Sequence, residues 1–158
     1  MDPTVWILFV PLGLTVVAGQ TLSEEILFRG YIQSQLAGRF AHPILWMVVP
    51  SVLFGFAHYA PSLPASAALG YVLIAALFGL IAADLTARTG SIGAAWGFHF
   101  ANNTMAILFV VSEGSLTGLG LFKTDEDLVD QIALSPLIAI DIAVLFGIYL
   151  LIRRFVAR

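Results

Sequence analysis

The apolar residues of this chain gather into five long runs, which are separated by short polar or proline-rich segments. The runs cover residues 5–18, 44–57, 65–85, 92–111 and 132–152. A membrane-spanning helix needs about 20 consecutive, mainly apolar residues, and these runs approach or reach that length. The pattern therefore predicts an all-α protein, folded as a multi-pass transmembrane helical bundle.

The stretch after the first run, residues 21–40, contains scattered polar side chains but keeps a helical pattern. Thr21 and Glu24 have the spacing of a capping box, so a second helix can begin there. One long helix that passes straight through is the other interpretation, and both stay open. His42 and Pro43 then mark a break, since proline is tolerated in the first turn of a new helix.

The composition supports a membrane protein with a single domain. The chain has 158 residues, of which 59% are hydrophobic and 11% charged, whereas an ordinary soluble domain has about 25% charged residues. Because so few charges cannot cover a protein surface in water, the apolar surface must face lipid. The absence of cysteine excludes disulfides, thiol nucleophiles and cysteine-ligated metal sites. No basic cluster indicates nucleic acid as a partner, and residues 1–158 are expected to form one domain.

The few basic residues give a first orientation. If the five runs alternate strictly across the membrane, every arginine lies on one side, which the positive-inside rule makes cytoplasmic. These residues are Arg29, Arg39, Arg88, Arg153, Arg154 and Arg158. Lys123 and an acidic loop over residues 113–131 then lie outside. Strict alternation also places Glu24 and His58 near opposite faces, so we expect the helix within residues 21–40 to fold back and bring them together.

Ionisable side chains within apolar helices are functional candidates, because each costs roughly 2.5–3.5 kcal/mol to insert. Glu25 and Arg29 are four residues apart and share a helical face, whereas Glu24 points in another direction. On this spacing Arg29 neutralises Glu25, and Glu24 is left to act as a general base in a low-dielectric pocket. A solvated charged patch at a helix end is the alternative interpretation. The same spacing predicts a local ion pair between Asp84 and Arg88.

Two histidines lie in or beside later apolar runs. His58 ends one run, just before a proline-rich loop, where an interfacial, hydrogen-bonded histidine is the alternative to a catalyst. His99 and Asn103 are four residues apart and share a helical face, with Trp96 nearby on it. A histidine and an amide side by side can donate hydrogen bonds to a developing oxyanion. A polar contact between two membrane helices is the alternative for this group.

In this order the three groups resemble the CPBP family, the CAAX-protease and bacteriocin-processing proteins. The motifs are Glu-Glu-x-x-x-Arg at residues 24–29, Phe-x-x-x-His at 54–58 and His-x-x-x-Asn at 99–103. Gly30 after the first motif also fits. The resemblance covers about residues 21–103, and it implies a membrane-embedded protease domain. The family includes type II CAAX prenyl endopeptidases, abortive-infection proteins and bacteriocin-processing or immunity proteins.

The resemblance implies a role for each matching residue. Glu24 matches the glutamate that activates water, and His58 matches the histidine that helps to position that water. His99 and Asn103 match the residues that stabilise the oxyanion. The accompanying pair, which we interpret as structural, is Glu25 and Arg29. All six side chains are expected to converge on one cavity, because leaving such groups in lipid is costly.

The resemblance leaves two mechanisms for activating water. Family members have often been described as metalloproteases, but no His-Glu-x-x-His motif is present in this sequence. We therefore expect a glutamate-dependent mechanism that needs no metal or other cofactor. The alternative is a zinc ion with an open coordination position, held by Glu24, His58 and His99.

The sequence thus predicts an intramembrane endopeptidase that hydrolyses a peptide bond in a membrane-associated substrate with glutamate-activated water. The alternative, from another class, is a non-enzymatic membrane transport or immunity protein that uses the same polar cluster for binding. The expected partners are a peptide or protein substrate and the lipid bilayer, with no nucleic acid. The expected location is a bacterial or archaeal cell membrane, in which the chain is an integral, multi-pass protein.

Overall fold

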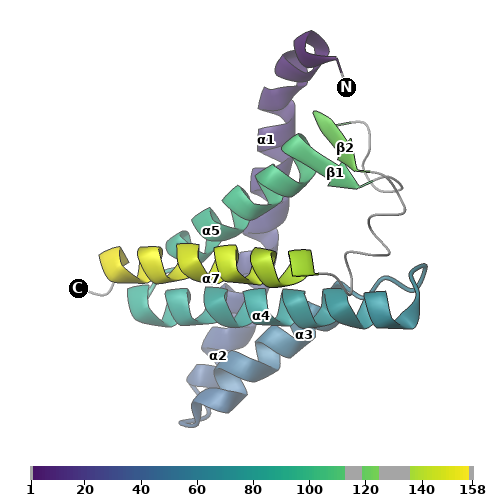
Figure 1. Ribbon diagram of the computed structural model, residues 1–158. Helices are drawn as coiled ribbons and strands as arrows, with labels where there is room; N and C mark the ends of the chain where they lie inside the picture. The colour runs from purple at the N-terminus through teal and green to yellow at the C-terminus, as the bar shows by residue number, and fades with distance from the viewer. Residues whose placement is uncertain (1, 113–118, 125–135, 157–158) are drawn as a thin grey trace.

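The computed structural model describes residues 2–112, 119–124 and 136–156, and within them the fold is almost entirely helical (Figure 1). The helices, with η for π-helical segments, are α1 (Pro3–Glu25), η1 (Ile26–Gln33), α2 (Ser34–Ala37), η2 (Ile44–Val48), α3 (Val49–Ala57), α4 (Ala65–Thr89), α5 (Gly93–Thr104), η3 (Met105–Phe109) and α7 (Pro136–Val156). Two short strands, β1 (Val110–Ser112) and β2 (Phe122–Thr124), pair in parallel. Most of the predicted acidic loop, including Asp125, Glu126, Asp127 and Asp130, lies outside the described residues.

The first run and the polar-flecked stretch after it form one continuous helix, Pro3–Ala37, made of α1, η1 and α2. It begins at Asp2, whose carboxylate accepts two backbone N–H groups of the first turn. The capping-box interpretation at Thr21 is wrong, because this residue lies in helical backbone and its hydroxyl donates to the Val17 carbonyl at 2.8 Å. The predicted fold-back within residues 21–40 is wrong for the same reason.

The second helix is much shorter than the first, and its C-terminal end lies against the long helix. The helix Ile44–Ala57 consists of 5 residues of η2 and 9 of α3, about 21 Å at 1.5 Å per residue. It ends beside the C-terminal part of the long helix, where the Phe54 and Phe28 ring centroids are 5.0 Å apart. The end of this helix therefore reaches the long helix near the first motif without a fold-back, and the contact is made by Phe54.

Small residues let α3 and α4 pack closely. A Cβ on Gly55 would lie 2.5 Å from the Val72 carbonyl oxygen and 2.9 Å from the Ala76 Cβ. A Cβ on Gly79 would approach the Ser51 Cα to 3.0 Å. Close approach at small residues is a common way to pack helices in lipid, where van der Waals contact replaces the hydrophobic effect. This packing holds the C-terminal half of α3 directly against α4.

Gly55→Ala is expected to destabilise the protein by about 1–3 kcal/mol, because the added methyl group overpacks the contact with Val72. Unfolding of the purified protein in mixed detergent micelles measures the loss. Gly97→Ala is the matched control, since a Cβ at that position meets nothing within 4 Å. Equal stability of the Gly55→Ala and Gly97→Ala proteins would contradict the close packing of α3 on α4.

An aromatic core joins four helical segments beside the polar residues. It contains Phe28 of η1, Phe54 of α3, Phe78 of α4 and Phe98 of α5, all of which are buried. The rings of Phe78 and Phe98 stack with centroids 5.0 Å apart and 11° between their planes. Such aromatic contacts contribute about 0.5–1.5 kcal/mol each beyond the burial of their area. The core therefore fixes the relative positions of the segments that carry the three motifs.

The last helix, α7, runs alongside α4 in the same direction (Figure 1). Near the C-terminal end of α4, the Asp84 carboxylate accepts a hydrogen bond from Arg88 Nε at 2.6 Å. It accepts another from the Tyr149 hydroxyl of α7 at 2.7 Å. Arg153 Nη1 donates to the same hydroxyl at 3.3 Å. The predicted Asp84–Arg88 ion pair is confirmed, and Tyr149 connects it to α7. The side chain of Asp141 lies outside the described residues.

Apolar side chains cover the outside of the long helices. Within the described residues, two helices, Pro3–Ala37 and Ala65–Thr89, are long and apolar enough by length and composition to cross a membrane. The helix Ile44–Ala57 is apolar but shorter. On the first helix, Leu8 is 75% exposed and Leu12 is 58% exposed. Apolar surface exposed over a whole helix suits contact with lipid or with another apolar partner.

Candidate active site

A buried ion pair lies where the long helix meets α3 and α4. Arg29 Nη1 donates to Glu25 Oε1 at 2.8 Å, and the two side chains are 1% and 0% exposed. Arg29 Nη2 also donates to the Gly79 carbonyl of α4 at 3.4 Å, and the guanidinium carbon lies 4.5 Å from the Phe54 ring centroid. The pair expected from the sequence spacing therefore forms, and it links three helices. Because Arg29 is buried beside Glu25, it is not one of the basic residues outside the membrane that the positive-inside rule uses to assign orientation.

His99 of α5 connects this ion pair to Glu24. Its Nδ1 lies 2.7 Å from Glu25 Oε1. Because an ionised carboxylate can only accept a hydrogen bond, Nδ1 carries the hydrogen. The other ring nitrogen, Nε2, lies 3.7 Å from Glu24 Oε2. One glutamate thus orients the imidazole, and the imidazole faces the other glutamate.

Glu24 is the more exposed of the two glutamates. Its side chain is 26% exposed, whereas that of Glu25 is 0% exposed. Its Oε1 accepts a hydrogen bond from Gln20 Nε2, one turn earlier on α1. Its Oε2 has no hydrogen-bond partner among the described residues, although it faces His99. Glu25 Oε2 likewise has no hydrogen-bond partner among the described residues, and both of these oxygens are themselves buried. The two glutamates differ in exposure: Glu25 is fully buried in its ion pair with Arg29, whereas the Glu24 side chain is partly exposed, as a general base that meets water must be.

The polar face of α5 lies against the long helix, as its spacing predicts. Trp96 Nε1 donates to Thr21 Oγ1 at 3.2 Å, and His99 contacts both glutamates. One turn further on, Asn103 Nδ2 donates to Gln20 Oε1 at 3.1 Å. Trp96 and Asn103 therefore contact the turn of the long helix at residues 18–21, and His99 contacts the next turn at Glu24 and Glu25.

The structure places His58 against Phe54 and not against Glu24. His58 Nδ1 lies 2.8 Å from the Phe54 carbonyl oxygen, and the centroids of the two rings are 4.5 Å apart. The Phe54 centroid is also 5.8 Å from that of His99. His58 is exposed at the end of α3. Five of the predicted residues are thus joined by polar contacts, directly or through Gln20, and His58 adjoins them through an aromatic ring.

Two residues of this site received no role from the sequence. Gln20 bonds to both Glu24 and Asn103, and Phe54 contacts Arg29 and both histidines of the site. A signal for Gln20 was available, because it lies four residues before Glu24 on the same helical face and is polar within an apolar helix. Phe54 begins the second motif, but the motif spacing does not indicate which residues its ring contacts.

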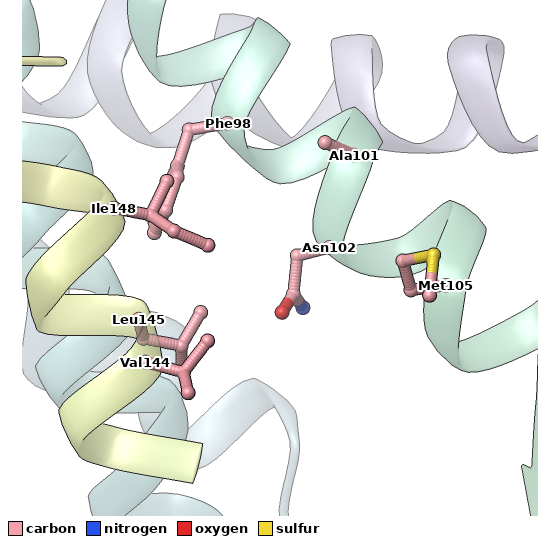
Figure 2. A pocket seen from close by; sticks show the side chains of 7 residues that line it. All are labelled: Phe98, Ala101, Asn102, Met105, Val144, Leu145 and Ile148. Atoms are coloured by element: carbon pink, nitrogen blue, oxygen red, sulfur yellow. The ribbon is translucent and has the colours of Figure 1, made fainter. Parts of the chain in front are cut away.

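A cavity of about 310 Å³ lies between α5 and α7. Figure 2 shows its lining side chains, with the Asn102 amide directed into the space between the two helices. The lining residues are Phe98, Ala101, Asn102, Met105, Val144, Leu145 and Ile148. None of the six predicted site residues is among them, so this cavity is not the predicted common one. It adjoins the polar cluster through Asn102, whose Nδ2 donates to Asn103 Oδ1 at 3.3 Å.

The three residues considered as zinc ligands do not converge on one point. Within the part of the chain that the structure describes, no three histidine, aspartate or glutamate side chains form a group that could hold a metal ion. His58 Nδ1 is engaged by its own helix, whereas His99 faces the two glutamates. Zinc requires ligand atoms at about 2.0–2.2 Å. Glu24, His58 and His99 therefore do not fit a zinc site in this arrangement.

Comparison with known proteins supports the grouping of these motifs. The model of the family described as type II CAAX prenyl endopeptidase Rce1-like matches residues 5–105 of the chain. The uncharacterized protein YyaK of Bacillus subtilis (strain 168) is 29% identical over 114 residues, which are 72% of this chain. The match covers 38% of the length of YyaK. No solved structure matches the chain significantly.

Proposed function

This chain belongs to the Rce1-like family of type II CAAX prenyl endopeptidases, and on that basis we propose that it is a glutamate-dependent intramembrane endopeptidase. The observation that carries the proposal is the partly exposed Glu24 carboxylate beside the buried Glu25–Arg29 pair. Its Oε2 lies 3.7 Å from His99 Nε2 and has no hydrogen-bond partner among the described residues. A carboxylate can act as the general base in peptide hydrolysis, and an imidazole and an amide can donate hydrogen bonds to the oxyanion. The proposed substrate is a peptide or protein at the membrane.

The proposed location is a bacterial or archaeal cell membrane that the chain crosses several times. The match to a family of membrane-associated proteases supports it, and so do the two helices of membrane-spanning length. The Bacillus relative supports a bacterial source. The short helix Ile44–Ala57 would then end within the membrane, so that the site lies at the depth of the lipid tails or their border.

Glu24 is the proposed general base. It takes a proton from a water molecule, and the oxygen of that water attacks the scissile carbonyl carbon to give a tetrahedral oxyanion. The oxyanion then re-forms the carbonyl, the C–N bond breaks, and Glu24 returns the proton to the departing nitrogen. The products are a carboxyl terminus and an amine, and Glu24 is ionised again. Glu25 and Arg29 stay paired throughout and hold His99 in place.

His99 and Asn103 are the proposed donors to the oxyanion. Asn103 Nδ2 carries two hydrogens, of which Gln20 Oε1 accepts one, and the other is free to donate. The Nδ1 hydrogen of His99 is held by Glu25, so the donor to the oxyanion is Nε2. Nε2 can donate in the form of the ring that carries a hydrogen on both nitrogens. His58 is proposed to position water and substrate from the exposed edge of the site, because its Nε2 points away from the bond to Phe54.

The purified protein in proteoliposomes is expected to cleave quenched fluorescent peptides, with and without a lipid anchor, and to keep its activity in the presence of a chelator. The general-base route uses side chains alone, so that stripping metal has no effect on turnover. Activity that is lost on chelation and regained with zinc would overturn the metal-free mechanism. Binding without any cleavage would favour the transport or immunity function that uses the same polar cluster.

A further inference from the structure

Three side-chain amides form a chain of hydrogen bonds that ends on Glu24. Asn102 Nδ2 donates to Asn103 Oδ1 at 3.3 Å, and Asn103 Nδ2 donates to Gln20 Oε1 at 3.1 Å. Gln20 Nε2 then donates to Glu24 Oε1. The carboxylate sets the direction of the chain, because it can only accept. Each amide must therefore turn its NH₂ group toward Glu24 and its oxygen toward the next amide.

Gln20 is the point at which this chain crosses from α5 to the long helix. Among the described residues, Gln20 supplies the hydrogen bond to Glu24 Oε1, and Oε2 has no such bond. A glutamate side chain has several rotatable bonds, and their freedom must be lost before the carboxylate has one orientation. With Oε1 held by Gln20, the other oxygen is directed toward His99, 3.7 Å away.

We propose that Gln20 is a positioning residue, which holds the Glu24 carboxylate in the orientation needed to accept a proton from water. The proposal rests on the proposed function, since only a base that acts on substrate needs this orientation. Asn103 and Asn102 extend the effect by fixing the Gln20 amide in turn. Gln20 itself touches neither water nor substrate in this role.

The contact between α1 and α5 does not depend on Gln20. Trp96 Nε1 donates to Thr21 Oγ1 at 3.2 Å and to the Ala18 carbonyl at 3.3 Å. Beyond the end of α5, Leu108 of η3 packs so closely on Gly13 of α1 that a Cβ on Gly13 would lie 2.6 Å from the Leu108 side chain. Removal of the Gln20 amide should therefore change catalysis far more than folding.

The test compares Gln20→Leu with Gln35→Leu, a matched change at an exposed position of the same long helix. Gln20→Leu is expected to lower kcat by roughly 10- to 100-fold, because a small misplacement of a catalytic group has an effect of that size. KM for a quenched fluorescent peptide and the melting temperature should stay near the wild-type values. Asn102→Leu, which removes the most distant link, should have a smaller effect in the same direction.

A second measurement does not require cleavage. The infrared difference between the wild-type and Glu24→Gln proteins identifies the carboxylate stretching band of Glu24, and its frequency reports the hydrogen bonds to that group. Gln20→Leu is expected to shift this band, whereas Gln35→Leu should leave it in place. If the wild-type protein cleaves no peptide, the proposed function fails, and the band still decides whether Gln20 holds Glu24. An unshifted band, or a kcat for Gln20→Leu equal to that for Gln35→Leu, would overturn the proposal.

Discussion

Glu24→Gln is expected to remove nearly all peptide hydrolysis, with kcat lower by about 10²–10⁴-fold, the usual contribution of a positioned general base. Glutamine has almost the shape of glutamate, but its amide cannot take a proton from water at neutral pH. Its oxygen can still accept from Gln20 Nε2, so the contacts around the site are retained. The side chain is also partly exposed, which keeps the cost of the change to folding small.

The activity of purified Glu24→Gln protein on quenched peptides measures this effect, together with its melting temperature in detergent. Ser23→Ala is a suitable control, because Ser23 is the exposed neighbour whose hydroxyl bonds only to the Gln20 carbonyl of its own helix. Asn103→Ala should retain more activity than Glu24→Gln, since loss of one oxyanion donor typically costs about 10²–10³-fold. A Glu24→Gln protein that keeps a tenth of the wild-type rate would refute the assignment of Glu24 as base.

The contacts that sequence could predict are those that helix geometry alone determines. Residues four apart on a helix are neighbours whatever surrounds them. The Glu25–Arg29 and Asp84–Arg88 pairs both form as expected, and the polar face of α5 meets a neighbouring helix. The division between a paired and an unpaired glutamate follows from the same geometry, because adjacent residues point about 100° apart on a helix.

The contacts that sequence could not predict depend on where helices end and cross. Thr21 has a side chain that caps a helix start or bonds to a carbonyl four residues earlier within a helix, and spacing alone does not distinguish the two. In this protein it bonds to Val17, so the helix continues. The short length of the second helix then decides that Phe54 lies near the polar cluster and that His58 lies beyond it. A hydrophobic pattern gives the presence of a helix more reliably than its ends.

The separation of His58 from Glu24 bears on how the proposed site closes around a substrate. His58 is exposed, and its ring rests on Phe54, which also contacts Arg29 and His99. The Phe54 ring therefore lies between the two histidines of the proposed site. Glu24 and His99 lie together beside the buried Glu25–Arg29 pair, whereas His58 is exposed at the edge of this cluster.

Arg29→Ala is expected to destabilise the protein by roughly 3–5 kcal/mol, the usual cost of leaving one member of a buried ion pair without its partner. Glu25, which is 0% exposed beside Arg29, would keep only the hydrogen bond from His99 among the described residues. The bond to the Gly79 carbonyl and the contact with the Phe54 ring would be lost as well. Glu25→Ala should destabilise the protein by a similar amount, because it leaves the buried Arg29 guanidinium without its carboxylate partner. Glu24→Gln should leave the stability nearly unchanged.

Unfolding in mixed detergent micelles measures these differences, and the second ion pair of the same spacing provides the matched control. Arg88→Ala removes a partner from Asp84, but the two side chains are 35% and 20% exposed. Exposed pairs contribute about 0–1 kcal/mol, so this variant should unfold close to the wild-type midpoint. The contrast tests burial as the cause, since both pairs join an acid and an arginine four residues apart. Equal losses for Arg29→Ala, Arg88→Ala and Glu24→Gln would show that the buried pair has no special structural role.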